Sequence, residues 1–107
     1  MAQDMQMVWR GAKLADALAE TDELKTTVME RGVLKVVFIR PNIEKTDTHE
    51  RDEVYVVTQG EISLTIDGVE NRLATGDAAF VAAGVEHTFH GLTDDVLLWS
   101  MRATPSA

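Results

Sequence analysis

The stretch that decides the fold is TDTHERDEVYVVTQG, residues 46–60, in which polar residues lead into an apolar run that a glycine ends. The run is rich in β-branched and aromatic residues and stops at a turn-forming residue, which predicts a β-strand. Alternate side chains of an extended chain share a face, so Asp47 and His49 point the same way. Glu53 shares its face with Tyr55, and it follows His49 by four positions across the polar corner ERD. We therefore expect Glu53 to return close to His49 and to form half of a metal site with it.

Two further histidines stand in the run HTFH, residues 87–90. The two-residue period of a strand places His87 on one face and His90 on the other, so His90 is expected at the surface, exposed or hydrogen-bonded. The two imidazoles of His49 and His87 and the carboxylate of Glu53 would leave open positions on a divalent ion, an arrangement associated with non-haem iron and similar metals. The competing interpretation is a metal-free polar cluster held by hydrogen bonds.

Outward from this stretch, short β-type runs separated by Gly, Asn and Asp fill the chain from about Leu24 onward and predict an all-β domain. The Asp-Gly pair in IDGV, residues 66–69, accepts the positive φ angles of a type I′ turn and predicts a tight hairpin. ISLTI, residues 62–66, alternates apolar and polar positions, whereas VLLWSM, residues 96–101, is apolar at nearly every position. The first strand is expected to have one face in the core and one face in solvent, whereas the second should be buried on both faces. A two-layer sandwich or barrel provides both environments. We expect its core to include Phe38, Phe80 and Trp99.

The run AKLADALAE, residues 12–20, predicts a short N-terminal helix. Its strong helix formers place Leu14, Ala17 and Leu18 on one stripe, which suits packing against an apolar surface. Because no repeat or linker divides the chain, we expect a single domain. Its expected parts are an arm and helix over residues 1–23, a β-barrel over residues 24–102 and a tail over residues 103–107.

Composition and charge exclude several classes of partner. The 107 residues carry a net charge of −8, which repels nucleic-acid phosphates and anionic lipid, so neither nucleic acid nor a membrane is expected as a partner. The chain has no cysteine, so any metal must be held by nitrogen and oxygen. Its first residues include Asp4 and no uninterrupted apolar run, unlike a secretory signal, and a cytoplasmic location is expected.

Two motifs make the chain similar to the cupins. In the first cupin motif, two histidines one residue apart precede a glutamate and a glycine. The chain has Asp47, His49, Glu53 and Gly60 at those positions. In the second motif, a glycine, a proline, a glycine, a histidine and an asparagine follow at fixed intervals, and the matching stretch here is GDAAFVAAGVEHTFHG, residues 76–91. The matching positions are Gly76, Ala82, Gly84, His87 and Gly91. The resemblance implies a cupin-type jelly-roll β-barrel or sandwich with a short N-terminal helix.

The chain departs from the cupin motifs in ways that bear differently on the metal. Pro41 and Asn42 lie where the opening glycine would stand, Ala82 fills the proline position and Gly91 fills the asparagine position. Asp47 stands in place of the first histidine and so alters the ligand set itself. As a ligand it would give two neutral imidazoles and two carboxylates, whose charge matches a divalent ion. Outside the ligand set it would accept a hydrogen bond from bound water or act as a base, and the sequence leaves these roles open.

Cupins include dioxygenases, sugar-phosphate isomerases and epimerases, decarboxylases, lyases, storage proteins and sugar-sensing domains, so the fold does not select one function. The resemblance implies a small metalloprotein whose divalent ion (iron, manganese, nickel or zinc) polarises a small oxygen-rich organic molecule. Asp47 and Tyr55 are the candidate catalytic residues, with the Tyr55 hydroxyl either orienting a substrate or serving only as packing. An oxygenase and an isomerase or lyase are both open. The alternative is a non-catalytic module that binds a small molecule or a metal.

A homodimer is the expected assembly, because single-domain cupins commonly pair and the apolar strands offer more surface than a small domain covers. The Met-rich start, with Met1, Met5 and Met7, is interpreted as a mobile arm or one that covers a partner. Anionic groups of a small-molecule ligand would need cationic anchors. The candidates are Arg40, Arg51, Arg72 and Arg102, which show no clustering in the sequence.

Overall fold

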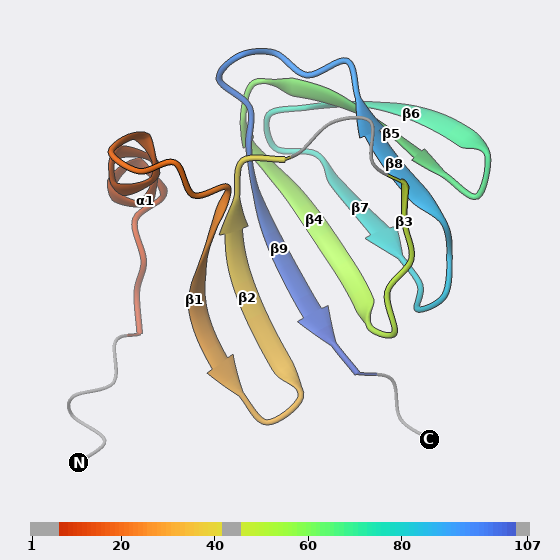
Figure 1. Cartoon of the computed structure of the whole chain (residues 1–107), viewed down its shortest axis with the longest axis horizontal. Coiled ribbons are helices and arrows are strands. Elements are labelled where there is room, and N and C mark those ends of the chain that lie inside the picture. The colour runs from red at the N-terminus through yellow and green to blue at the C-terminus, as the bar shows by residue number, and fades with distance from the viewer. Residues whose placement is uncertain (1–6, 42–45, 105–107) are drawn as a thin grey trace.

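The computed structural model describes residues 7–41 and 46–104, and the side chains of Thr46 and Asp47 lie outside the described part. These described residues form one helix and nine strands in chain order (Figure 1). They are α1 (Gly11–Ala19), β1 (Lys25–Arg31), β2 (Leu34–Ile39), β3 (Thr46–Asp47), β4 (Asp52–Gln59), β5 (Glu61–Ile66), β6 (Val69–Ala74), β7 (Ala78–Val81), β8 (His87–His90) and β9 (Leu97–Ala103). Within the described residues, no helix is long and apolar enough to cross a membrane.

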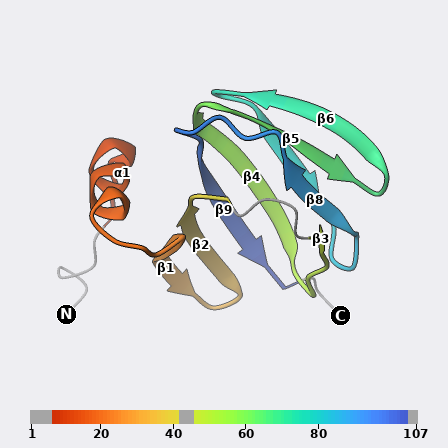
Figure 2. The same cartoon turned by 45° about the horizontal axis from the view of Figure 1, so that its top comes forward.

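The strands form two antiparallel sheets that face each other as a jelly-roll sandwich. One sheet has the order β1-β2-β9-β4-β7 and the other the order β3-β8-β5-β6. Figures 1 and 2 show the strands of the second sheet lying over β4 and β7, away from β1. β9, which comes last in the sequence, lies between β2 and β4. The predicted all-β fold class is therefore confirmed.

The hairpin of β5 and β6 has the turn that its sequence predicts. Asp67 and Gly68 have φ angles of 48° and 80°, as both central residues of a type I′ turn require. The turn sets Ile66 opposite Val69 and Ile62 opposite Leu73. Ile62 and Leu73 point into the core, so the register set by the turn also selects the buried face.

The core lies between the two sheets and is built from alternate residues of each strand. β4 shows the pattern most clearly, because Tyr55 and Val57 are buried while Val54 and Val56 are only half-buried. Leu64 of β5 and other apolar residues of the facing sheet complete this cluster. At one end of the sandwich, the inward-facing positions of the strands carry polar residues in place of apolar ones. These polar residues form the site described below.

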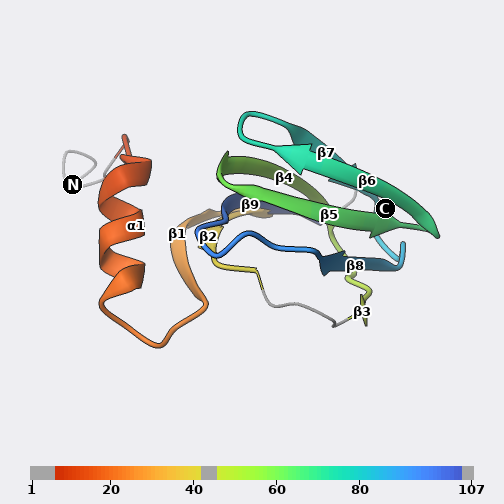
Figure 3. The same ribbon diagram turned by 90° about the horizontal axis from the view of Figure 1, so that it is seen from above.

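Helix α1 lies beside β1 and β2, at the opposite end of the molecule from the β5–β6 hairpin (Figure 3). Leu18 packs with Phe38 and Leu97, and Leu14 and Ala15 are partly buried against them. The expected stripe was therefore wrong at Ala17, which is exposed.

A hydrogen bond from Arg40 Nη2 to the Leu18 carbonyl, 2.9 Å long, ties the end of the helix to the end of β2. This bond satisfies one of the carbonyls that a helix end leaves without an intrahelical partner.

The aromatic residues expected in the core separate into two groups. Phe38 is fully buried and meets the half-buried Trp99 edge-on, with ring centroids 5.0 Å apart. Phe80 is 58% exposed, so its assignment to the core was wrong. It lies on β7, an edge strand, directly opposite Val54, whose side chain points away from the core. The two-residue period of a strand predicts which face of β7 carries Phe80. It does not predict whether another element covers that face.

Candidate metal site

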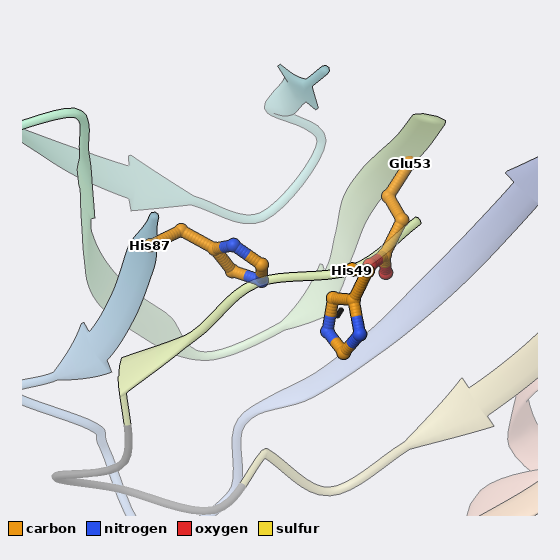
Figure 4. Close-up of side chains that lie close together, drawn as sticks. All are labelled: His49, Glu53 and His87. Atoms are coloured by element: carbon orange, nitrogen blue, oxygen red, sulfur yellow. Dashed lines mark ion pairs between the residues drawn. The ribbon is translucent and has the colours of Figure 1, made fainter. Parts of the chain in front are cut away.

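Three side chains from different parts of the chain converge at one end of the sandwich (Figure 4). Glu53 comes from β4, His87 opens β8, and His49 lies in the short connection between β3 and β4. Pairing of β3 with β8 sets Asp47 opposite His87, which brings the segment carrying His49 beside the second histidine. The amide of Gly84 also donates a 2.7 Å hydrogen bond to the His49 carbonyl. Both connections fix His49 relative to His87.

The three side chains are close enough to share one ion. One possible ligand atom from each of His49, Glu53 and His87 lies within 4.8 Å of the other two. The two imidazole rings have centroids 5.1 Å apart. Glu53 and His87 are buried, whereas the His49 side chain is 35% exposed and forms the solvent side of the group.

The two carboxylate oxygens of Glu53 have different surroundings. Oε2 accepts a hydrogen bond from the Ser100 hydroxyl at 3.2 Å and lies 3.2 Å from Arg102 Nε. Oε1 is buried and receives no hydrogen bond from the described residues, although His49 Nε2 lies 3.2 Å away, within ion-pair distance when that imidazole is protonated. A buried carboxylate oxygen without a donor costs about 1–3 kcal/mol or more. A cation between Oε1 and the imidazoles would remove that cost.

The contacts of His87 select the tautomer that binds a metal through Nε2. Its Nδ1 lies 3.2 Å from the Val85 carbonyl, which only accepts, so Nδ1 carries the proton. Nε2 then presents its lone pair and lies 3.2 Å from the Tyr55 hydroxyl, which donates to it. A backbone acceptor on the far nitrogen is the usual arrangement for a histidine that ligates a metal.

Two cavities open beside this cluster. The larger has a volume of about 470 Å³, and His49, His87, Tyr55 and Phe89 form the part of its wall nearest the cluster. The smaller has a volume of about 300 Å³, and both His49 and Arg102 line the two cavities. The larger volume suits a small organic molecule.

The residues present fit a divalent metal ion. Two imidazoles and one carboxylate are ligands that iron, manganese, nickel and zinc accept, and they leave open positions for water or substrate. The Glu53 oxygen that lacks a hydrogen-bond donor in the described part of the chain, Oε1, is the one in contact with His49. The donor set and this unsatisfied oxygen therefore point to the same ion position.

The other residues singled out in the sequence have different positions. The backbone of Asp47 pairs with His87, but its side chain lies outside the described part, so its role stays a prediction. Tyr55 is 2% exposed and packs edge-on against Phe89, with ring centroids 5.0 Å apart. His90 lies on the outer face, where Nε2 is 3.1 Å from the Thr65 hydroxyl. The predicted opposite orientation of His87 and His90 is therefore seen.

Three of the four candidate arginines line the cavities beside the site. Arg102 lines both cavities, and Arg40 lines the larger one but also holds the end of α1. Arg72 bonds the Gly91 carbonyl at 2.7 Å on another part of the surface. Arg51 is exposed and lines the smaller cavity. Of the residues in the Met-rich start, Met1 and Met5 lie outside the described part of the chain.

The sequence reading missed Ser100, which holds Glu53 in place. The signal was available in the alternation of β9, where Leu98, Ser100 and Arg102 share the inner face. A polar residue and a charged residue follow an apolar one on that face, as expected where a strand passes from core to site.

Comparison with known proteins agrees with this geometry. The family model described as "Cupin domain" matches residues 36–101, which is more than half of the chain and includes His49, Glu53 and His87. Among curated proteins, the chain is 32% identical over 59 residues to the uncharacterised protein SCO3923 of Streptomyces coelicolor. That match covers 55% of this chain and 56% of the relative, so the chain spans little more than half of the relative's length.

Solved structures share the architecture. KdgF from Halomonas sp. superposes with a TM-score of 0.69 at 23% identity, over 77% of this chain and 78% of that one. An RmlC-like cupin from Shewanella frigidimarina superposes with a TM-score of 0.65 at 22% identity, over 76% of this chain and 75% of that one. At these identities the likeness concerns the fold alone. The chain belongs to the cupin family.

Proposed function

We propose that this cupin is a metal-dependent enzyme that acts on a small oxygen-rich organic molecule at the His49, Glu53 and His87 cluster. The observation that carries the proposal is Glu53 Oε1, a buried oxygen that faces His49 and has no hydrogen-bond donor among the described residues. A site built only for stability would pair or replace such an oxygen, because leaving it unsatisfied lowers the free energy of unfolding. The adjoining 470 Å³ cavity gives a ligand access to the same position.

A bound divalent ion would act as a Lewis acid that polarises a ligand oxygen and fixes its position. The residues of the chain supply the rest. Ser100 and Arg102 hold Glu53 Oε2, which directs Oε1 toward the imidazoles. The Val85 carbonyl holds the proton of His87 on Nδ1, which keeps Nε2 ready to bind. Phe89 and Ile39 give the larger cavity an apolar wall that limits water near the ligand.

The Tyr55 hydroxyl is a side-chain group placed to act on a ligand. It lies 3.2 Å from His87 Nε2 and its residue lines the larger cavity. When His87 Nε2 is a metal ligand, it no longer accepts the Tyr55 proton, and the O–H can donate to an oxygen of the bound molecule. We therefore assign Tyr55 the role of orienting the substrate. Asp47 keeps the role of an additional ligand or a base.

The direct test is elemental analysis of protein purified without a metal-binding tag. About one equivalent of metal is expected in the wild type, as for a single mononuclear site, with loss in His49→Ala. His90→Ala is the matched control, because His90 is the histidine on the outer face. Loss of metal in Asp47→Ala would make Asp47 a ligand. Absence of metal under every loading condition would overturn the proposal in favour of a metal-free binding module.

Reaction type is then decided by oxygen consumption. An oxygenase consumes gas when given its substrate, and an isomerase or lyase does not, so an oxygen electrode with a panel of diketones, phenols and hydroxy acids separates the two. Turnover of no compound by the metal-loaded protein, together with tight binding of one, would show a non-catalytic module.

A further inference from the structure

Lys35 and Arg102 lie side by side on the inner face of the five-stranded sheet. The register of β2 and β9 pairs Lys35 with Arg102, and the register of β9 and β4 pairs Arg102 with Glu53. Val37, two residues after Lys35, is buried in the core between the sheets, so Lys35 shares this inner face. Two cations and one carboxylate therefore form a row beside the metal site.

The charges in this row do not balance. Arg102 has its Nε within 3.2 Å of Glu53 Oε2, and it is 17% exposed. Lys35 is half-buried, and the described residues provide no ion pair for it. Glu30 is its cross-strand neighbour on β1, but Glu30 is exposed and is not within ion-pair distance. Like charges directly opposite each other on a sheet are destabilising, which disfavours Lys35 beside Arg102 unless an anion joins them.

The space in front of these cations is hollow. Lys35 and Arg102 line the smaller cavity of about 300 Å³, together with His49 and Glu53 of the metal site. Arg51 and Glu50, both exposed, form its outer wall. The whole chain carries a charge of −8 and repels anions at long range, so any affinity for an anion must come from such a local group of cations.

We propose that Lys35 and Arg102 form an anion-binding subsite for a carboxylate or phosphate group of the molecule that the metal site holds. The inference rests on the proposed function for the identity of that molecule. Glu53 links the two positions, because Oε1 faces His49 and Oε2 contacts Arg102. A ligand with one oxygen at the metal and an anionic group a few bonds away can therefore span both. The substrate class is a small anionic oxygen compound.

The test is calorimetric titration of the full chain with inorganic phosphate and, separately, with malonate. Each titration uses metal-loaded protein and protein freed of metal by a chelator. Lys35→Met removes the ammonium group, and Lys35→Arg keeps the charge. Lys13→Met is the matched control, because Lys13 is exposed on α1 and lines neither cavity.

Lys35→Met is expected to raise the dissociation constant of the bound anion about tenfold, the effect of one charge-assisted hydrogen bond. The dissociation constants of Lys35→Arg and Lys13→Met are expected to stay within about twofold of the wild-type value. Lys35→Arg keeps the local charge, and Lys13 lies far from the subsite. Preference for phosphate or for malonate identifies which group the subsite takes. Failure of both anions to bind the wild type, or an equal effect of Lys13→Met, would overturn the proposal.

Metal content measured on the same samples keeps the two proposals apart. Lys35→Met retains His49, Glu53 and His87, so its metal content is expected to equal that of the wild type. A wild type without metal would contradict the proposed function, whereas the comparison of Lys35 variants in chelator-treated protein would still decide the anion subsite.

Discussion

Ser100 and Glu53, 47 positions apart in the sequence, form a buried hydrogen bond in which the Ser100 hydroxyl donates to Glu53 Oε2 at 3.2 Å. Arg102 Nε adds a second contact to the same oxygen and also bonds the Ser100 hydroxyl at 3.1 Å. Both contacts hold Oε2, which leaves Oε1 facing the imidazoles. β9 therefore orients the Glu53 carboxylate toward the proposed ion position.

Ser100→Ala should weaken metal binding about tenfold, because groups that orient a ligand typically contribute 10- to 100-fold to metal affinity. It should also lower the free energy of unfolding by about 1–3 kcal/mol, since Oε2 loses a buried donor. Competition with a coloured chelator gives the affinity and urea unfolding gives the stability. Ser63→Ala is the control, because Ser63 is also buried and hydrogen-bonded, but to Arg72. Equal metal affinity in both variants would contradict the role of Ser100.

Tyr55→Phe should leave the metal content unchanged and reduce ligand binding or turnover. The ring still packs against Phe89, so the loss in unfolding free energy should be only about 0.5–1.5 kcal/mol, as for one hydrogen bond. Calorimetry with a turned-over or tightly bound compound, beside elemental analysis, measures both quantities. If Tyr55→Phe leaves ligand binding and turnover unaltered, Tyr55 serves only in packing.

Metal loading should raise the thermal stability of the chain, because the ion binds the assembled site and not the separated ligands of the unfolded chain. An ion at a hundredfold excess over its dissociation constant adds about 2.7 kcal/mol. The effect should shrink as the pH is lowered, because protons compete with the metal for the two imidazoles. Melting curves with metal and with chelator test this, using His90→Ala as control. Identical melting temperatures with and without metal would argue against the site.

Gly60→Ala should destabilise the fold strongly. Gly60 has a φ of +77°, and a Cβ there would lie 2.5 Å from Thr93 Oγ1 and 2.8 Å from the Val96 Cα. Backbone strain should therefore lower the free energy of unfolding by about 1–2 kcal/mol, and overpacking should lower it by a further 1–3 kcal/mol or so. Gly68→Ala is the control, because its φ is +80° and nothing lies within 4 Å of the added carbon. The difference between the two variants in urea unfolding isolates the steric part, and no difference would refute it.

Local sequence rules predict the individual strands and turns of this fold well. They predict poorly which strands lie next to each other in the sheets. The Asp-Gly turn and the alternation in β4 follow from backbone sterics and the period of two, which act within a few residues. The approach of His49 to Glu53 follows from a short corner. The position of β9 between β2 and β4 depends on contacts between residues far apart in the sequence, and so Ser100 was missed.

The errors have the same origin. Phe80 is apolar and lies in a strand, but it is exposed because its face of the edge strand β7 is not covered by the described residues. Ala17 fits the apolar stripe of the helix, yet the angle at which α1 meets Phe38 and Leu97 buries Ala15 more. Both outcomes depend on tertiary packing, which periodicity does not encode.

The most direct measurement is anomalous diffraction at the absorption edge of the metal, on crystals of protein loaded with the ion that it retains through purification. We expect a single strong peak about 2.0–2.3 Å from Glu53 Oε1 and from one nitrogen each of His49 and His87, the range of metal–oxygen and metal–nitrogen bonds. A peak bound by other residues, or a site in which the Glu53 carboxylate has turned away toward Arg102, would contradict it.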